Sequence, residues 1–371
     1  MTGPAPQDTP RHDVYLDWMR GVAALLVFFA HVRNGFFVPW SALDTASQTP
    51  LNELLFFVTR LGRESVIVFF VLSGYLVGGQ AFAELRAGRY SMRRYLIARI
   101  ARLQTVLLPA LALTSLCDAL RHAWTVDVDG WHAFMINLFF LQGVFGPLYG
   151  SNGPLWSLAY EWWFYIVFGL GIALASRPGP RRTALLVSAL CVLTAVLWQR
   201  CPAILGMMPL WLAGVAVRTL PVVRSVNRWL PAIAGVVLFV CLGVSGLRRD
   251  YVGDCLVGVA TCLLIYTVRP LPPLSYRWFP LGKGLAAFSF TLYAFHSPLN
   301  VLVESILVPQ RLTVASPGQW LAWGVLVLGV SAVCYALYWG FERQTPVVRR
   351  LLESIWPGAP AQRGTRMQVP S

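Results

Sequence analysis

Charged side chains are scarce in this chain. Asp, Glu, Lys and Arg make up 12% of its 371 residues, which is about half of what a soluble domain usually carries. Hydrophobic residues make up 57%, and the mean hydropathy is +0.60. This composition excludes an ordinary soluble domain and indicates a polytopic membrane protein.

Lysine is almost absent as well. One lysine stands beside 29 arginines, and with 16 acidic residues the formal net charge is +14. A strongly basic chain can bind nucleic acid, but these arginines fall mostly in loops between hydrophobic segments. Roughly three quarters of them belong to the N-terminus, the even-numbered loops and the C-terminus, which the positive-inside rule assigns to the cytosol. We therefore expect both termini in the cytosol and no nucleic-acid partner.

Cysteine pairs with a recognisable spacing are also missing. The seven cysteines form no CxxC motif and show no metal-ligand spacing; they are Cys117, Cys191, Cys201, Cys241, Cys255, Cys262 and Cys334. Their odd number and apolar surroundings argue against a disulfide framework, and we expect no metal site. No cleavable signal peptide is evident, because the first hydrophobic segment is long and contains charges.

Long hydrophobic runs, in contrast, recur along the whole chain. Ten of them are expected to cross the membrane, at residues 14–38, 65–82, 103–119, 155–175, 184–198, 204–217, 230–247, 251–268, 285–307 and 320–341. Residues 127–153 hold an apolar piece too short to cross, which we expect to re-enter from the outer side. The sequence thus predicts an all-α, polytopic integral membrane protein of about ten transmembrane helices. Residues 1–13 are expected to be a disordered cytosolic leader, residues 14–345 the transmembrane domain and residues 346–371 a cytosolic tail.

The first hydrophobic segment carries three ionisable side chains, Asp17, Arg20 and His31. Arg20 and His31 are eleven residues apart, so they fall on one helix face, about 20° from register, and Asp17 lies near the same face. Ionisable groups inside a span are costly and are functional by default. The structural alternatives are that Arg20 reaches the headgroups, that Asp17 lies at the interface, and that His31 bonds to a neighbouring helix.

An arginine pair, Arg99 and Arg102, stands at the entry to the third predicted span, with Arg93 and Arg94 just before it. Arginines at positions i and i+3 share a helix face, and their guanidinium forks suit phosphate oxygens. The pattern favours a grip for an anionic, nucleotide-bearing cosubstrate from the cytosol, with Arg93 as a further contact. Positive-inside anchoring alone is the other explanation.

A glutamate, Glu161, lies a little over one turn inside the fourth predicted span. A carboxylate buried there must be paired or protonated, so Glu161 is a candidate acid or base, or a partner of a histidine. An ion pair with Arg63 or Arg33 is the structural alternative. The aromatic side chains around it, which include Trp156 and Tyr165, are typical of an interface belt or of a platform for a sugar ring.

Two further polar groups lie inside predicted spans. Ser73 and Tyr75 flank Gly74 in the second, where glycine permits close helix packing and the hydroxyls bond across helices. His296 lies in the ninth span and is as consistent with a structural hydrogen bond as with a site. We count Asp17, Trp156, Tyr165, Ser73, Tyr75 and His296 as candidate contacts for a substrate.

Five motifs occur in a specific order along the chain. They are LDWMRG with the Arg20-x10-His31 spacing, FFVLSGYL, the RxxR of residues 99–102, WSLAYEWWFY and FSFTLYAFHSPL. Together they resemble the acyltransferase type 3 family of integral membrane acyltransferases. The resemblance covers nearly the whole chain, and it implies a transmembrane acyltransferase domain of about ten helices at residues 14–345.

The resemblance also implies an activity. It implies transfer of an acyl group, with acetyl as the expected one, from cytosolic acyl-coenzyme A to a hydroxyl of a saccharide or glycoconjugate such as an exopolysaccharide. The coenzyme would be a cosubstrate, with no tightly bound cofactor, and the location would be a bacterial cytoplasmic membrane. The chain resembles the stand-alone form, without the fused C-terminal hydrolase-like domain of some members.

By the same resemblance His31 is the catalytic residue, Arg20 its companion, Arg99 and Arg102 contacts for the donor, and Glu161 a site residue. We hypothesise that His31 is a general base for the acceptor hydroxyl. An acyl-histidine intermediate is the competing mechanism.

Two other classes of protein fit parts of the sequence. A transporter or flippase of a saccharide or a lipid-linked sugar would also carry ionisable groups within many spans, but no pair of similarly interrupted segments is visible in the two halves. A sensor or scaffold without chemistry is the third interpretation. The sequence does not indicate the oligomeric state.

Overall fold

The computed structural model describes residues 14–121, 128–223, 226–227, 229–272 and 279–357. Its helices are α1 (Val14–Phe36), α2 (Pro50–Thr59), α3 (Gly62–Ser73), α4 (Gly79–Arg86), α5 (Met92–Leu120), α6 (Val128–Leu138), α7 (Trp156–Ala175), α8 (Pro180–Arg200), α9 (Pro202–Thr219), α10 (Trp229–Arg248), α11 (Tyr251–Val268), α12 (Phe279–Leu307), α13 (Pro317–Gly340) and α14 (Thr345–Ile355). No strand occurs among these residues, and ten helical segments are long and apolar enough to cross a membrane. The predicted all-α fold with about ten transmembrane helices is confirmed.

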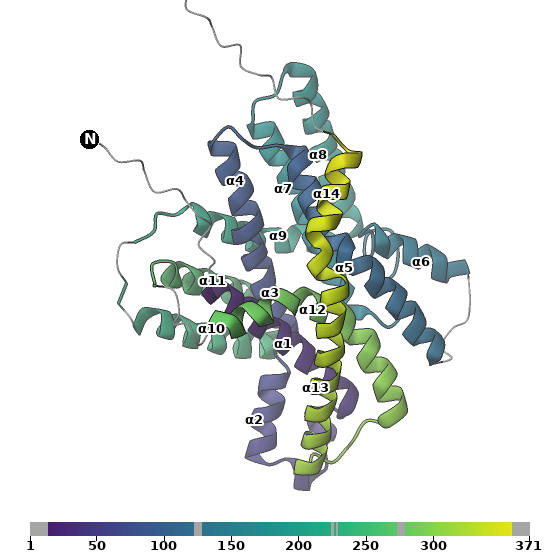
Figure 1. Ribbon diagram of the computed structural model, residues 1–371. Coiled ribbons are helices and arrows are strands. Elements are labelled where there is room, and N and C mark those ends of the chain that lie inside the picture. The colour runs from purple at the N-terminus through teal and green to yellow at the C-terminus, as the bar shows by residue number, and fades with distance from the viewer. Residues whose placement is uncertain (1–13, 122–127, 224–225, 228, 273–278, 358–371) are drawn as a thin grey trace, which may run out of the picture.

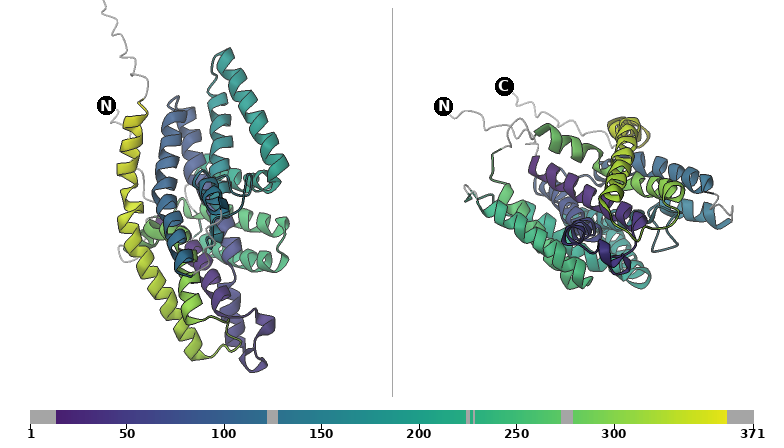
Figure 2. Two further views of the ribbon diagram at one scale, coloured as in Figure 1. Left: turned by 90° about the vertical axis from the view of Figure 1, so that its right-hand side faces the viewer. Right: turned by 90° about the horizontal axis from the view of Figure 1, so that it is seen from below.

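The helices pack around a centre formed by α1, α3 and α12 (Figure 1). Helix α1 packs most extensively against α12 and then against α3, while α10 and α11 form a hairpin at one side. Figure 2 shows α7 and α8 projecting together at one end, with α13 and α14 running along the opposite flank. The ionisable face of α1 is therefore enclosed by other helices.

Small residues permit the close approach of α1 to its neighbours. A side chain at Gly21 would collide with Leu285 of α12, and one at Gly62 of α3 would collide with Ala30. Large apolar residues such as Phe28 fill the remaining space and are fully buried. These contacts bring the polar face of α1 against α3 and α12.

Helices α3 and α4 are joined by a π-helical turn, η3 (Gly74–Gly78). A Cβ at Gly74 would overlap the carbonyl oxygen of Trp211 in α9, and one at Gly214 would overlap the carbonyl oxygen of Val71. The backbones of α3 and α9 therefore touch, as expected for the Ser73-Gly74-Tyr75 segment. Such π turns are frequent at functional sites because they change which side chains face inward.

Several helices begin or end outside the spans predicted for them. Helix α5 starts at Met92, and not near residue 103, because Ser91 caps it and accepts a hydrogen bond from the Arg94 N–H at 3.5 Å. Residues 346–355 of the predicted tail belong to α14, which packs against α5. The predicted leader, residues 1–13, and residues 358–371 of the tail lie outside the described residues.

The segment expected to re-enter the membrane contains α6, which has 11 residues, followed by tight turns. The buried amide of Asn152 donates to the Ala294 carbonyl of α12 at 2.9 Å and to the Thr114 hydroxyl at 3.1 Å. This link fixes the short turn η4 (Gly153–Leu155), which leads into α7. The start of α7 is thereby held against α12.

Candidate active site

Two cavities follow one another along α1. One, the Arg20 cavity, has a volume of about 310 Å³ and is lined by Arg20, Ser73, Arg99, Arg102, Glu161 and Tyr165, among others. The other, the His31 cavity, has a volume of about 470 Å³ and is lined by Val27, His31, Arg33, Glu64 and Trp156, among others. Arg20 and His31 are separated by roughly 16 Å along the helix, which explains why they belong to different cavities.

Three guanidinium groups meet at the Arg20 cavity. Arg99 lies 5.8 Å from the ring centre of Tyr165, and Arg102 lies 5.7 Å from that of Phe290. The Nε of Arg99 is buried without a hydrogen-bond partner among the described residues. Guanidinium groups held against rings keep their N–H donors, so this cluster is suited to an anion.

Glu161 ends a chain of hydrogen bonds in the same cavity. Trp211 Nε1 donates to Ser73 Oγ at 3.1 Å, Ser73 Oγ lies 3.0 Å from the Tyr165 hydroxyl, and that hydroxyl donates to Glu161. Since the Tyr165 proton is used on Glu161, Ser73 must be the donor to Tyr165. The network fixes the carboxylate toward the arginines. Glu161 does not line the His31 cavity.

The structural alternative for Glu161 was an ion pair with Arg63 or Arg33. Arg63 is instead paired with the buried Asp254 of α11, with both nitrogen–oxygen distances at 2.9 Å. Arg33 lies over Phe56, 5.0 Å from the ring centre. Neither arginine contacts Glu161.

A buried acid that the sequence reasoning missed, Glu342, also faces the arginines. It lies in the short turn η5 (Glu342–Gln344) after α13, and its Oε2 accepts hydrogen bonds from Thr291 N at 2.9 Å and Thr291 Oγ1 at 2.7 Å. Arg102 and Arg20 are within electrostatic range of it. The available signal was a lone acid at the end of a long apolar run, WGFERQ.

Arg93 does not lie with the other arginines of its cluster. Its Nε donates to the Trp356 carbonyl and its NH2 group to the Glu353 carbonyl, the latter at 2.9 Å. These are carbonyls at the C-terminal end of α14, which a cation stabilises. The sequence treated Arg93 as a donor contact, whereas the structure gives it a different partner.

His31 is paired with His296, whose ring centre lies 4.9 Å from its own. Each histidine bonds through Nδ1 to the carbonyl four residues earlier, His31 to Val27 and His296 to Leu292, both at 2.8 Å. A carbonyl only accepts hydrogen bonds, so each Nδ1 carries a proton and the neutral ring presents an Nε2 lone pair. His296 is fully buried and lines neither cavity, whereas His31 lines one.

Val66 and Tyr293 line both cavities and form the partition between them. The Tyr293 hydroxyl donates to the Pro154 carbonyl at 2.8 Å, so it accepts from Ser157, whose Oγ lies 2.5 Å away. Residues at the start of α7 and just before it thereby hold the Tyr293 ring in place. The partition is one side chain thick on each helix, since the same residues face both sides.

The other predicted substrate contacts are divided. Ser73 and Tyr165 line the Arg20 cavity, and Trp156 lines the His31 cavity. Tyr75 lines neither, because it is buried against Arg218, whose NH1 group donates to its hydroxyl at 3.3 Å. Asp17 is buried near the start of α1, within electrostatic range of Arg20.

Many apolar helices enclosing two polar cavities define a multi-pass membrane protein with a polar interior. A family model described as an acyltransferase domain matches residues 13–339. The chain therefore belongs to the acyltransferase type 3 family.

Two curated relatives match parts of the chain. Acyltransferase MdmB of Streptomyces mycarofaciens is 28% identical over 170 residues, which cover 45% of this chain and 41% of the relative. An uncharacterized protein of Haemophilus influenzae is 29% identical over 122 residues, which cover 30% of this chain and 49% of the relative. The matched regions thus span less than half of either relative. No solved structure matches the chain.

Proposed function

We propose that this chain is a membrane-embedded O-acyltransferase that moves an acyl group, acetyl in the first instance, from acyl-coenzyme A to a hydroxyl of a saccharide or glycoconjugate. The observation that carries the proposal is the order of the two cavities along α1. The Arg20 cavity holds the arginine cluster, and the His31 cavity holds a histidine whose Nε2 makes no bond to the helix backbone. The two cavities adjoin at Val66 and Tyr293.

The Arg20 cavity suits the donor. Coenzyme A carries phosphates, and Arg99 and Arg102 offer guanidinium forks that no carboxylate among the described residues occupies as an ion pair. The acyl-bearing arm would extend from these arginines toward Tyr293. Arg20 lines the same cavity, and in the proposal its cation stabilises negative charge that develops on the thioester oxygen.

The His31 cavity suits the acceptor. In the proposed step Nε2 of His31 takes the proton of the acceptor hydroxyl while that oxygen bonds to the thioester carbonyl carbon. The carbon–sulfur bond breaks, and the coenzyme A thiolate leaves and receives the proton from His31. Glu161 lies on the donor side, so its proposed role is to hold Tyr165 and the arginines and not to orient the imidazole. The competing route is attack by Nε2 itself, which would give an acyl-histidine.

The proposed location is the bacterial cytoplasmic membrane with both termini in the cytosol, on the basis of the arginine distribution. In that orientation the Arg20 cavity, near the first residue of α1, faces the cytosolic coenzyme A pool. A flippase of a saccharide or lipid-linked sugar is the second candidate, and cavities toward both ends of one helix favour it equally.

Transfer of radiolabelled acetyl from acetyl-coenzyme A into saccharide material tests the proposal. Membranes with equal amounts of the wild type or of His31→Ala are compared. Loss of labelling only in the variant, by at least ~100-fold, is expected for a general base. Equal labelling, or none across several acyl donors, would contradict it. Uptake of labelled saccharide into vesicles without acylation would favour the flippase.

A further inference from the structure

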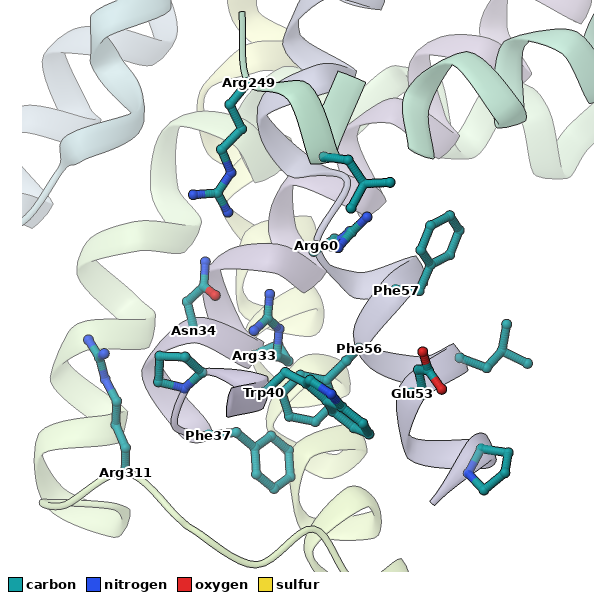
Figure 3. A pocket seen from close by; sticks show the side chains of 14 residues that line it. Arg33, Asn34, Phe37, Trp40, Glu53, Phe56, Phe57, Arg60, Arg249 and Arg311 are labelled. Carbon is teal, nitrogen blue, oxygen red and sulfur yellow. The ribbon is translucent and has the colours of Figure 1, made fainter. Parts of the chain in front are cut away.

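A third and larger cavity opens at the C-terminal end of α1. It has a volume of about 860 Å³, and we call it the arginine vestibule, lined by Arg33, Asn34, Trp40, Arg60, Arg249 and Arg311, among others (Figure 3). Four of these residues, Arg33, Asn34, Arg60 and Arg249, also line the His31 cavity. The vestibule therefore adjoins the cavity of His31.

None of the four arginines of the vestibule forms an ion pair in the described part of the chain. Arg33 is only 8% exposed, its Nε has no hydrogen-bond partner, and the charged groups acting on it are Arg60 and Arg249, which repel it. A buried cation beside two others is unfavourable unless an anion joins them.

Aromatic rings hold two of these arginines without occupying their donors. Arg33 lies 5.0 Å from the ring centre of Phe56, and Arg60 lies 5.0 Å from that of Phe57. The face of an aromatic ring attracts a guanidinium group. The N–H groups of the guanidinium remain free to donate hydrogen bonds to a ligand. The arrangement positions a fork for a ligand at low cost in side-chain ordering.

Arg249 occupies a conformation that its residue type disfavours. It follows α10 with a φ of 52°, in the left-handed region where helices usually end with glycine. Figure 3 shows its side chain reaching toward Asn34 from one side while Arg311 reaches from the other. Its neighbour Arg248 instead pairs with Asp250 at 2.8 Å and lines none of the three cavities.

Three acids lie nearby. Glu53 lines the vestibule, Glu304 is within electrostatic range of Arg311, and Glu64 is within electrostatic range of Arg249. None of them is within ion-pair distance of any of the four arginines. The guanidinium donors therefore remain open to an oxyanion.

We propose that the arginine vestibule binds an acceptor that carries an oxyanion, a phosphate or a carboxylate, and anchors it there while a nearby hydroxyl reaches His31. The inference rests on the proposed function, which places the acceptor hydroxyl beside His31. Arg33 and Asn34 follow His31 by about 3 and 4.5 Å along the axis of α1, and all three residues line the His31 cavity. The acceptor class is thus an acidic or phosphate-linked saccharide, and not a neutral one.

Binding of defined anions to the purified full-length protein tests this proposal. The protein is placed in phosphatidylcholine nanodiscs, and calorimetry measures binding of inorganic pyrophosphate and of trigalacturonate. We expect at least one of them to bind, with an affinity that falls as salt rises. Arg60→Gln and Arg249→Gly should each weaken that binding about tenfold or more. Arg248→Gln removes a charge one residue away and should leave it unchanged.

Stability separates a binding role from a structural one. Arg249→Gly relieves the left-handed backbone, so its melting temperature should equal or exceed that of the wild type while anion affinity falls. Failure of both anions to bind, or an equal loss in Arg248→Gln, would overturn the proposal. Anion binding unaffected by Arg60→Gln and Arg249→Gly would overturn it as well.

Two further comparisons identify the source of the anion and separate this inference from the proposed function. Displacement of the probe by phosphatidylglycerol in the nanodisc would assign the oxyanion to a lipid-borne phosphate, and displacement by trigalacturonate alone would assign it to a saccharide carboxylate. Hydrolysis of acetyl-coenzyme A by Arg248→Gln, whose side chain lines none of the three cavities, should match the wild type. Acyl transfer without anion binding would refute only the proposal that the vestibule binds an anion. Anion binding without any acyl transfer would refute only the proposed acyltransferase function.

Discussion

The rings of His31 and His296 lie 4.9 Å apart, and each is fixed through Nδ1 to the carbonyl one turn earlier in its own helix. Two imidazoles with a proton on Nδ1 therefore stand side by side, one facing a cavity and one fully enclosed. The enclosed ring also contacts Phe28 at 5.7 Å between ring centres. We regard His296 as a positioning residue that limits the orientations of His31.

The first prediction separates the two histidines. His31→Asn should abolish transfer, whereas His296→Asn should lower kcat about tenfold and leave KM for the donor unchanged, since its amide can still bond to Leu292. The pH profile of the His296 variant should shift, because the neighbour of the base has changed. Steady-state kinetics over a pH series checks this. Equal losses in both variants would instead make His296 a second participant in the reaction.

The second prediction concerns the arginine cluster. Arg99→Gln should raise KM for acetyl-coenzyme A by about tenfold or more, because a charge-assisted contact with phosphate is lost. Arg93→Gln should leave that KM unchanged and lower the melting temperature, since Arg93 holds the end of α14. Donor titrations and thermal unfolding of both variants test the assignment. A KM effect of Arg93→Gln as large as that of Arg99→Gln would contradict it.

The third prediction concerns the partition. Tyr293→Ala should join the two cavities, admit water to the thioester, and so raise acetyl-coenzyme A hydrolysis while transfer falls. Tyr293→Phe keeps the ring and should retain transfer, at a stability cost of about 1 kcal/mol for the lost hydrogen bonds. Release of free coenzyme A, measured with and without acceptor, distinguishes the two variants. No rise in hydrolysis for Tyr293→Ala would argue against a separating wall.

The fourth prediction tests the acid that sequence reasoning missed. Glu342→Gln should lower the free energy of unfolding by about 1.5–3 kcal/mol, because two charge-assisted hydrogen bonds to Thr291 weaken. The matched control is Glu353→Gln, which breaks an exposed pair with Arg349 and should cost less than about 1 kcal/mol. Unfolding in detergent compares them. Similar values for both would mean that Glu342 contributes little to the fold.

The fifth prediction tests the contact between α3 and α9. Gly74→Ala should destabilise the protein by about 3 kcal/mol or more, since its methyl group overlaps the Trp211 carbonyl. Gly206→Ala, which has open space around its Cβ position in α9, should be neutral or stabilising by up to about 1 kcal/mol. Expression level and melting temperature check the pair. A folded, equally stable Gly74→Ala would contradict the close backbone contact.

The fold could be predicted well because hydrophobic length and arginine position are local properties of the sequence. The spacing alone also predicted that the ionisable residues of α1 share one face. Spacing along one helix does not, however, reveal which side chains of other helices pack across that face. Arg20 and His31 share a face but are divided by Val66 and Tyr293, which come from α3 and α12.

Other features depended on contacts between distant parts of the chain. Arg93 has the same local pattern as Arg99, and only the return of α14 gives it a different partner. The arginine vestibule draws Arg249 and Arg311 from two loops that the sequence treats as ordinary connections. No periodicity links those loops to α1, so this group could not be predicted from the pattern.

The partition at Val66 and Tyr293 has an electrical consequence. Polar cavities approach it from both ends of α1, so the insulating layer of the protein is thinnest there. A membrane potential would fall mainly across that layer, where moving one elementary charge is worth about 2.3 kcal/mol per 100 mV. In the proposed step an acyl group crosses in one direction and a proton in the other, so one complete transfer moves no net charge. The equilibrium between donor and acylated acceptor should therefore be the same in energised and de-energised membranes, whereas passage of a charged substrate through the partition would follow the voltage.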